Sequence, residues 1–326
     1  MDVLKDRFGR KINYMRISVT DRCNLRCRYC MPEVTEHLPM REILTYEEIA
    51  FVCAQAAVLG IDQFRITGGE PLVRKNCAAL VSMLKGIPGI RRVAMTTNGV
   101  LLQEHLEELL EAGLDAVNIS LDSTDREQYR AVTGMDELER VLASVRLAAG
   151  KLPVKINCVV LRVVNEDAPV HLAALARDLP VDVRFIELMP IGAGKDLESV
   201  PNASVLAALE EQYGMMAEDP DPRGSGPAVY RRPEGFAGRI GFISAMHGKF
   251  CGKCNRLRLT STGDLKPCLC YADSVPLREI LRGDAAGREE RIREKIREAA
   301  ALKPQAHCFE TRDDVTEHRK MSQIGG

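Results

Sequence analysis

The sequence has no tryptophan, and aromatic residues make up only 5% of its 326 residues. Positive and negative side chains nearly cancel, so the formal net charge is −1. A protein that binds nucleic acid through basic patches with exposed aromatic rings needs both features, so the composition argues against such a partner. No run approaches the roughly eighteen apolar residues that a membrane span needs, and the N-terminus lacks an apolar signal segment. We expect a cytoplasmic protein without a membrane partner.

The eleven cysteines are the unusual feature of the composition. An odd number in a chain without a secretion signal argues against a disulfide framework and favours metal or redox use. Three cysteines fall within residues 23–30 and four within 251–270. The other four are scattered and receive no chemical role: Cys53, Cys77, Cys158 and Cys308. The first three of these have apolar neighbours, which is typical of a cysteine in a protein core.

Short apolar runs alternate with amphipathic stretches of helical period. The expected strands are Met15–Val19, Gln63–Thr67, Arg92–Thr97, Ala116–Leu121, Val154–Leu161 and Val183–Leu188. The expected helices are Tyr46–Leu59, Cys77–Leu84, Gln103–Glu111, Glu137–Leu147 and Ala168–Arg177. Most strands are separated by roughly thirty residues, the size of a βαβ unit. The fold class is therefore α/β, an incomplete parallel (β/α)6 barrel that is similar to part of a TIM barrel and is closed by the C-terminal region.

The alternation stops after Leu188. Residues 192–201 and 219–227 are typical of loops, and the second of these segments is rich in proline, glycine and aspartate. A charged helical stretch follows at Ala286–Ala301. We therefore expect two domains, the barrel in residues 1–190 and a C-terminal region in residues 191–326.

The first cysteine group is Cys23, Cys27 and Cys30. It directly follows the first expected strand, at the carboxyl end where parallel barrels place their chemistry. Three thiolates can hold three irons of a cubane cluster and leave the fourth iron open to a ligand. The alternative is a zinc site, but structural zinc takes four ligands and no fourth lies close in the sequence.

The second cysteine group begins with Cys251 and Cys254, and Cys268 follows after thirteen residues. A zinc ribbon is an alternative here, because a CxxC pair with later cysteines is its usual form. Arg256 and Arg258 adjoin the group and would face one side of an extended segment. Two guanidinium groups on one face suit a polyphosphate, although a pair of solvated surface arginines would have the same spacing.

The spacing CxxxCxxC, with Tyr29 before the last cysteine, resembles the signature of the radical S-adenosylmethionine (SAM) superfamily. The segment Thr67–Pro71 resembles the superfamily's GGE motif, in which a carboxylate such as that of Glu70 accepts from the SAM ammonium group. In that superfamily the open iron chelates SAM, and an electron from the cluster releases a 5′-deoxyadenosyl radical. The resemblance implies that SAM is bound by Tyr29, Gly69, Glu70, Thr96, Ser120, Asn157 and Met189.

Both cysteine groups, the segment from Cys254 to Arg258 and the terminal Gly325-Gly326 together resemble the GTP 3′,8-cyclase family across nearly the whole chain. The resemblance implies a second [4Fe-4S] cluster on Cys251, Cys254 and Cys268, whose open iron binds the guanine base. It also implies that the C-terminal glycines reach into the active site. By the same resemblance, GTP is bound by Arg16, Arg65, Lys155, Arg184, Arg256 and Arg258.

The resemblance implies a lyase that performs the first step of molybdenum cofactor biosynthesis without an acid or base residue. The radical abstracts the 3′ hydrogen of GTP, and the 3′ carbon attacks C8 of guanine. The product is 3′,8-cyclo-7,8-dihydro-GTP, formed with 5′-deoxyadenosine and methionine. The expected partners are an external electron donor and the cyclic pyranopterin monophosphate synthase that receives the product, and a homodimer is left open.

One position departs from the family. Where the family often has a substrate-binding lysine, two residues before Arg65, this chain has Gln63. Cys270 is a spare thiol, because Cys268 matches the family spacing. Two other readings remain at this point: a different two-cluster radical SAM enzyme that acts on a peptide, and a non-catalytic zinc or RNA-binding protein.

Overall fold

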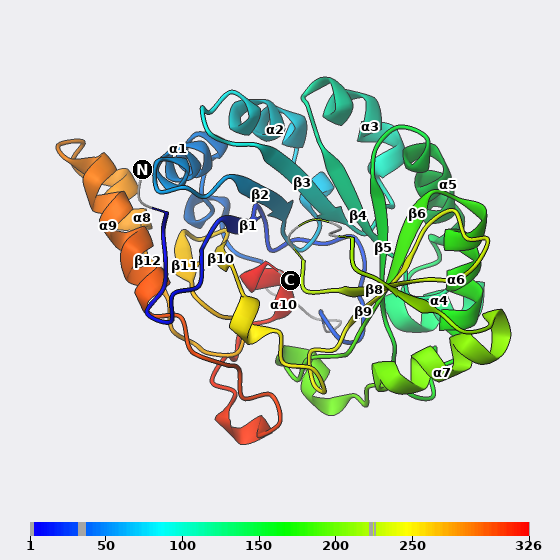
Figure 1. The fold of residues 1–326 in the computed structure, drawn as a ribbon. Coiled ribbons are helices and arrows are strands. Elements are labelled where there is room, and N and C mark those ends of the chain that lie inside the picture. Colours follow the sequence, from blue (N-terminus) through cyan, green and yellow to red (C-terminus); the bar gives the residue numbers. More distant parts are fainter. Residues whose placement is uncertain (1–2, 32–36, 222–223, 225, 326) are drawn as a thin grey trace.

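The structure is a computed structural model that describes residues 3–31, 37–221, 224 and 226–325. Within these residues the strands form one 12-stranded sheet that curves into an open barrel, with helices on its outer side (Figure 1). The strands are β1 (Tyr14–Ser18), β2 (Gln63–Thr67), β3 (Arg92–Thr97), β4 (Ala116–Ser120), β5 (Val154–Val159), β6 (Val181–Ile186), β7 (Ala217–Asp219), β8 (Val229–Arg232), β9 (Ile240–Ile243), β10 (Arg256–Leu259), β11 (Asp264–Lys266) and β12 (Val275–Pro276).

Eight neighbouring strands of this sheet are parallel, in the order β10-β1-β2-β3-β4-β5-β6-β9. The six expected strands are β1 to β6, and they confirm the incomplete parallel barrel. The C-terminal region adds β9 beside β6 and β10 beside β1, so it extends both edges of the sheet. Antiparallel strands complete the two ends, with β8 and β7 beyond β9 and β11 and β12 beyond β10. The sheet is therefore continuous across residue 190, and the division into two domains stays a prediction.

The helices are α1 (Tyr46–Val58), α2 (Cys77–Lys85), α3 (Leu102–Glu111), α4 (Arg126–Thr133), α5 (Leu138–Ala149), α6 (Ala168–Asp178), α7 (Asn202–Tyr213), α8 (Arg278–Arg282), α9 (Arg288–Ala301) and α10 (Met321–Ile324). The five expected barrel helices are confirmed to within two residues at each end. Local chemistry explains such limits: α1 begins at a capping box in which Thr45 Oγ1 accepts from Glu48 N at 3.1 Å and the Glu48 carboxylate accepts from Thr45 N at 2.8 Å. The sequence did not predict α4 and α7.

The barrel strands alternate between an apolar outer face and a polar inner face. On β2, Phe64 and Ile66 are fully buried in the core under the helices, whereas Gln63 and Arg65 line an interior cavity. Successive side chains of a strand point to opposite faces, so every second residue of each strand points inward. A closed small barrel fills its interior with apolar side chains, whereas this open barrel keeps a polar interior.

The loop between β9 and β10 carries Cys251 and Cys254 from one edge of the parallel strands to the other. Glu187, at the end of β6, ties this loop to the barrel. Its buried carboxylate accepts from Met246 N at 2.8 Å, from His247 N at 3.1 Å and from Asn202 N at 3.0 Å. Burial would raise the pKa of Glu187, but these N–H donors lower it, which holds the group as a carboxylate.

Candidate active site

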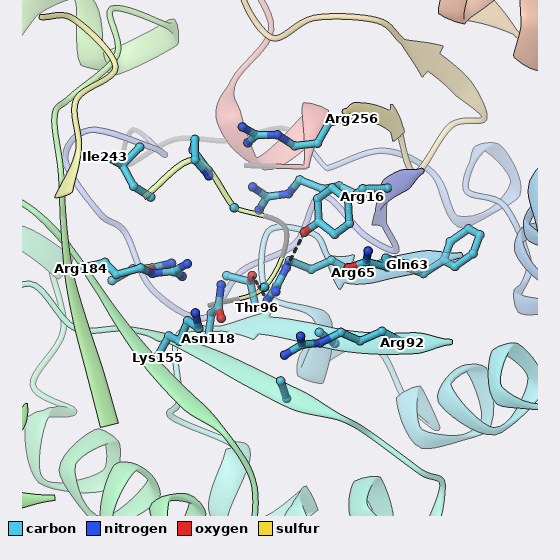
Figure 2. Close-up of a pocket in the computed structure, with 18 of the residues that line it drawn as sticks. Arg16, Gln63, Arg65, Arg92, Thr96, Asn118, Lys155, Arg184, Ile243 and Arg256 are labelled. Carbon is cyan, nitrogen blue, oxygen red and sulfur yellow. Dashed lines mark hydrogen bonds between the residues drawn. The ribbon is translucent and has the colours of Figure 1, made fainter. Parts of the chain in front are cut away.

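The interior of the barrel holds two adjoining cavities. The first, which we call the cysteine cavity, is lined by Cys23, Cys27, Cys30 and by Tyr29, Gly69, Glu70, Thr96, Ser120, Asn157 and Met189. The second, which we call the cationic cavity, is lined by Arg16, Arg65, Arg92, Lys155, Arg184 and Arg256 (Figure 2). Arg16, Thr96 and Asn157 line both, so the two cavities are neighbouring parts of one chamber.

The first cysteine group lies at the carboxyl end of β1, as expected. Cys23 Sγ accepts from Leu25 N at 3.4 Å and lies 3.8 Å from Asn98 Nδ2. Burial raises the pKa of Cys23 to about 11 and that of Cys30 to about 12, so both are neutral thiols until a metal displaces their protons. Among the described residues, no group of three or more His, Cys, Asp or Glu side chains is arranged to hold a metal ion.

The two glycines after β2 allow the backbone to approach the cysteine loop closely. Gly69 N donates to Thr20 O at 2.7 Å, and Glu70 N donates to Arg22 O at 2.8 Å. A Cβ at Gly69 would overlap the carbonyl group of Arg22, so a side chain there would push the loop away. The GG pair therefore packs the end of β2 against the segment that carries the first cysteines.

Glu70 is buried at the rim of the cysteine cavity. Its Oε1 accepts from Thr97 Oγ1 at 2.7 Å and from Leu72 N at 3.1 Å, and its Oε2 accepts from Asn98 N at 2.6 Å. Burial raises its pKa to about 7, against the effect of these donors. Each carboxylate oxygen has two acceptor positions, so Oε2 keeps one for a ligand in the cavity.

All seven residues predicted to bind SAM line the cysteine cavity together with the three cysteines. Their side chains come from different strand ends and are fixed by further contacts. Tyr29 Oη donates to Asp122 Oδ2 at 2.8 Å, which joins the cysteine loop to the end of β4. Asn157 Oδ1 accepts from Arg184 Nε at 2.9 Å, which connects the two cavities.

Five of the six predicted GTP-binding residues line the cationic cavity, and the sixth, Arg258, lines the cysteine cavity. None of the described residues that line the cationic cavity carries a carboxylate. Asp182 Oδ2 lies 3.6 Å from Lys155 Nζ, but Asp182 is not among the residues that line the cavity. The interior therefore gathers positive charge with little compensation.

The basic groups perturb one another. Burial and then Arg258 hold the pKa of Arg16 well below its usual value. Burial and then Arg184 lower the pKa of Lys155 to about 7, despite the opposing effect of Asp182. Arg256 Nε is buried and has no hydrogen-bond partner among the described residues. A multiply charged anion in the cavity would relieve both the repulsion and the unsatisfied donor.

The second cysteine group lies at the opposite end of the chamber. Cys251 and Cys254 precede β10, which is parallel to β1, whereas the first group follows β1. Lys303 Nζ lies 3.5 Å from Cys254 Sγ, and His307 N donates to Cys251 Sγ at 3.4 Å. Burial alone would raise the pKa of Cys254, but Lys303 and Arg256 bring it down to about 7. Cys254 is therefore poised to carry negative charge as a thiolate, whereas burial raises the pKa of Cys251.

Cys270 contacts a cysteine outside this group. It is fully buried, and its Sγ lies 3.1 Å from the Sγ of Cys308. The sequence assigned no role to either residue and did not predict their contact. Cys268 and Cys254 both act electrostatically on Cys251, whereas Cys270 is not among the groups that do, which favours Cys268 as the third member of the second group.

The C-terminal segment reaches the chamber, and α10 lies within the ring of strands (Figure 1). Gly325 has a φ of +73°, and a Cβ there would lie 3.1 Å from Thr67 Oγ1. Its carbonyl oxygen accepts from Arg258 Nη1. Glycine is therefore required at 325 by both conformation and space. Gly326, the other predicted tail residue, lies outside the described residues.

Sequence reasoning missed two cations: Arg92, which lines the cationic cavity, and Lys303, which lies beside the second cysteine group. Arg92 stands four residues before Thr96 on one strand, so the period of two would have placed both on the inner face. Lys303 is only 2% exposed and follows α9, far in sequence from the cysteine group that it contacts. No local pattern predicts such a long-range contact.

Known proteins resemble this chain over nearly its whole length. A model of the radical SAM superfamily matches residues 17–176, and a model named Molybdenum Cofactor Synthesis C matches residues 181–309. A GTP 3′,8-cyclase of Pelotomaculum thermopropionicum is 46% identical over 329 residues, which cover 99% of this chain and 100% of that protein. A GTP 3′,8-cyclase of Moorella thermoacetica is 44% identical over 328 residues, with 99% and 100% covered.

Solved structures share the fold. Streptococcus suis SuiB bound to S-adenosylmethionine has a TM-score of 0.63 at 12% identity, with 96% of this chain and 77% of that chain covered. The structure of anSMEcpe with bound AdoMet and the Kp18Cys peptide has a TM-score of 0.57 at 17% identity, with 81% and 76% covered. At these identities the likeness shows the fold alone.

The second cysteine group gives a test with a matched control. Wild-type protein reconstituted with iron and sulfide should hold about eight irons per chain, the content of two cubanes. Cys268→Ser should lower this to about four, because the second group loses a ligand. Cys270→Ser, two residues away, should keep the wild-type content, since its sulfur faces Cys308. Iron analysis distinguishes the two variants, and equal iron loss in both would contradict the assignment of Cys268.

Proposed function

The chain belongs to the GTP 3′,8-cyclase family, and from that premise we propose how its cysteine groups and cations divide the work of the reaction. The enzyme converts GTP, SAM and a reductant into (8S)-3′,8-cyclo-7,8-dihydroguanosine 5′-triphosphate, 5′-deoxyadenosine and methionine, in the first step of molybdenum cofactor biosynthesis. The full-length identity favours this activity over that of a peptide-modifying radical SAM enzyme.

Radical SAM enzymes use a [4Fe-4S] cluster and SAM. In this chain, Cys23, Cys27 and Cys30 are the proposed ligands of that cluster. Their common cavity, together with the GG pair that lets the backbone approach, supports the proposal. When bound, the cluster supplies one electron and SAM supplies the radical that begins the reaction. The protein contributes by positioning these groups and by excluding competing reactions.

Glu70 is the proposed acceptor for the SAM ammonium group. Glu70 lines the cavity that also contains the three cysteines, and its Oε2 accepts only one hydrogen bond from the described residues. Burial raises the pKa of Glu70 to about 7, and a positively charged ligand beside it would favour the ionised form of the carboxylate. Thr97 and Asn98 hold the carboxylate in place through hydrogen bonds that do not depend on the ligand.

The cationic cavity is the proposed site of the GTP triphosphate. The single observation that carries this proposal is a cavity with six basic side chains and no carboxylate among the described lining residues, adjoining the cavity of the first cysteine group. A guanidinium group can donate two parallel hydrogen bonds to the oxygens of a phosphate, and burial strengthens each of these contacts. Arg256 Nε, which lacks a partner, is the donor most clearly reserved for a ligand.

A second [4Fe-4S] cluster on Cys251, Cys254 and Cys268 is the proposed binding site for the guanine base. Two observations support it: the cations beside Cys254 favour its thiolate, and the group precedes β10 whereas the first cysteines follow the parallel strand β1. GTP would then span the chamber, with the base at the second group and the ribose toward the SAM side. Gly325 is proposed to border this space, held by Arg258.

The partners are proposed from the chemistry. The reaction consumes an electron, so an external donor is required, and the product passes to the cyclic pyranopterin monophosphate synthase. We also propose a cytoplasmic location, which the eleven free cysteines of the structure support. No helix in the described part of the chain is long and apolar enough to cross a membrane.

Turnover under anaerobic conditions tests the proposed substrate. Reconstituted enzyme with SAM and dithionite should form 5′-deoxyadenosine several times faster with GTP than without it. ATP, which carries the same triphosphate on another base, should not give this stimulation. Chromatography of the products measures both rates. Equal stimulation by ATP would contradict the guanine site, and stimulation by a peptide in place of GTP would contradict the activity.

Proton uptake tests the role of Lys155. With a pKa of about 7 in the free enzyme, Lys155 is mostly neutral at pH 8. A bound triphosphate favours the ammonium form, so binding at pH 8 should take up about one proton, and affinity should fall as the pH rises above 7. Calorimetry in two buffers of different ionisation enthalpy measures the uptake. Lys155→Met should abolish it; an unchanged uptake in that variant would exclude Lys155 as its source.

A further inference from the structure

Arg92 is a sixth basic residue of the cationic cavity, and neither the family resemblance nor the spacing of the motifs assigned it a role. It is the first residue of β3, and its side chain lines the cavity with those of Ala94 and Thr96 from the same strand. Figure 2 shows the guanidinium of Arg92 extending into the cavity on the side of Lys155 and Asn118. Arg92 therefore shares the interior with the proposed GTP ligands.

Arg92 supplies charge to a wall that otherwise has none. The other five cations come from β1, β2, β5, β6 and β10. Between β2 and β5, the strands β3 and β4 contribute Ala94, Thr96, Ala116 and Asn118, all uncharged, besides Arg92. Without Arg92, an anion in the cavity would meet no positive charge from β3 and β4.

The guanidinium of Arg92 is also available for a ligand. It makes no hydrogen bond or ion pair with the residues that the structure describes. The cations from the flanking strands β2 and β5 are engaged: Arg65 Nε donates to Tyr14 Oη at 2.6 Å, and Lys155 Nζ donates to Tyr230 Oη at 2.8 Å. Five N–H donors in a planar fork suit the oxygens of one or two phosphates.

The sheet register connects Arg92 to the residue that departs from the family. Gln63 on β2 and Arg92 on β3 are Cα partners on neighbouring parallel strands, and both line the cavity. The two side chains therefore occupy the same layer of the barrel. Gln63 on β2 is uncharged, whereas its partner Arg92 on β3 carries a positive charge.

The neighbouring Arg91 shows that inward placement is specific. Arg91 lies just before β3, its side chain is 71% exposed, and it pairs with Asp62 on the outside. Arg91 and Arg92 thus carry the same charge at adjacent positions, but only Arg92 lines the interior. This gives a control that matches both the residue type and the location in the chain.

We propose that Arg92 binds the triphosphate of GTP and provides from β3 the positive charge that a basic residue at position 63 would provide from β2. The proposal rests on the proposed function, since it places the triphosphate in the cationic cavity. Arg92 acts here as a substrate-binding residue, through its charge and its fork of donors. The triphosphate end of GTP then meets the wall formed by β3 and β4.

The test compares three variants of the full-length reconstituted enzyme by equilibrium binding of GTP and of SAM. Arg92→Gln, which removes the charge and keeps a polar side chain, should raise the Kd for GTP about tenfold to hundredfold, the effect of losing a charge-assisted contact. Its Kd for SAM should stay at the wild-type value. Arg91→Gln should leave both constants unchanged. Gln63→Lys combined with Arg92→Gln should recover most of the lost GTP affinity, because it returns a charge to the same layer.

The outcomes distinguish the role of Arg92 from the proposed function of the enzyme. If Arg92→Gln binds GTP as tightly as Arg91→Gln does, the proposal for Arg92 is wrong while the cyclase activity stands. A loss of GTP and SAM affinity together, without recovery by Gln63→Lys, would show a structural role and would also overturn it. If the wild-type enzyme itself fails to bind GTP, the proposed function fails first. The loss for GTP should exceed that for guanosine, which lacks the phosphates; equal losses would place Arg92 elsewhere.

Discussion

The organising constraint of this structure is the burial of like charges. Six basic side chains line one interior cavity, and no carboxylate lines it within the described residues. Burial, and then repulsion by the neighbouring cations, lowers the pKa values of Arg16 and Lys155. A fold that only needed stability would place apolar side chains there. A polyanion bound in the chamber would therefore stabilise the protein, as a triphosphate substrate would.

The two cysteine groups lie at opposite ends of the parallel strands. The first cysteine group follows β1, and the second precedes β10, which lies beside β1 and runs in the same direction. The chamber thus has a cysteine group at each end and the cations between them. Contacts far apart in the sequence maintain it: Glu187 anchors the loop to the second group, Lys303 neutralises charge beside Cys254, and Arg258 holds Gly325.

Sequence patterns predicted the parts of this architecture that depend on local spacing. The bounds of β2 and β3 were predicted to the residue, and the predicted SAM residues all line one cavity, because strand-end motifs meet at one rim of a parallel barrel. The short strands β9 and β10 were missed, since four residues between loops carry little periodicity. The contact of Cys270 with Cys308 and the position of Lys303 depend on tertiary packing and left no local signal. The position of Arg92 could have been predicted, because inward and outward side chains alternate along its strand.

The central claim is that SAM at the first cysteine group and GTP in the cationic cavity meet within one chamber. Turnover with GTP deuterated at the 3′ position tests this most directly, because the label moves only if the two reacting groups are adjacent. The account predicts that mass spectrometry finds the deuterium in 5′-deoxyadenosine. Formation of unlabelled 5′-deoxyadenosine from the labelled GTP, at an undiminished rate, would contradict it.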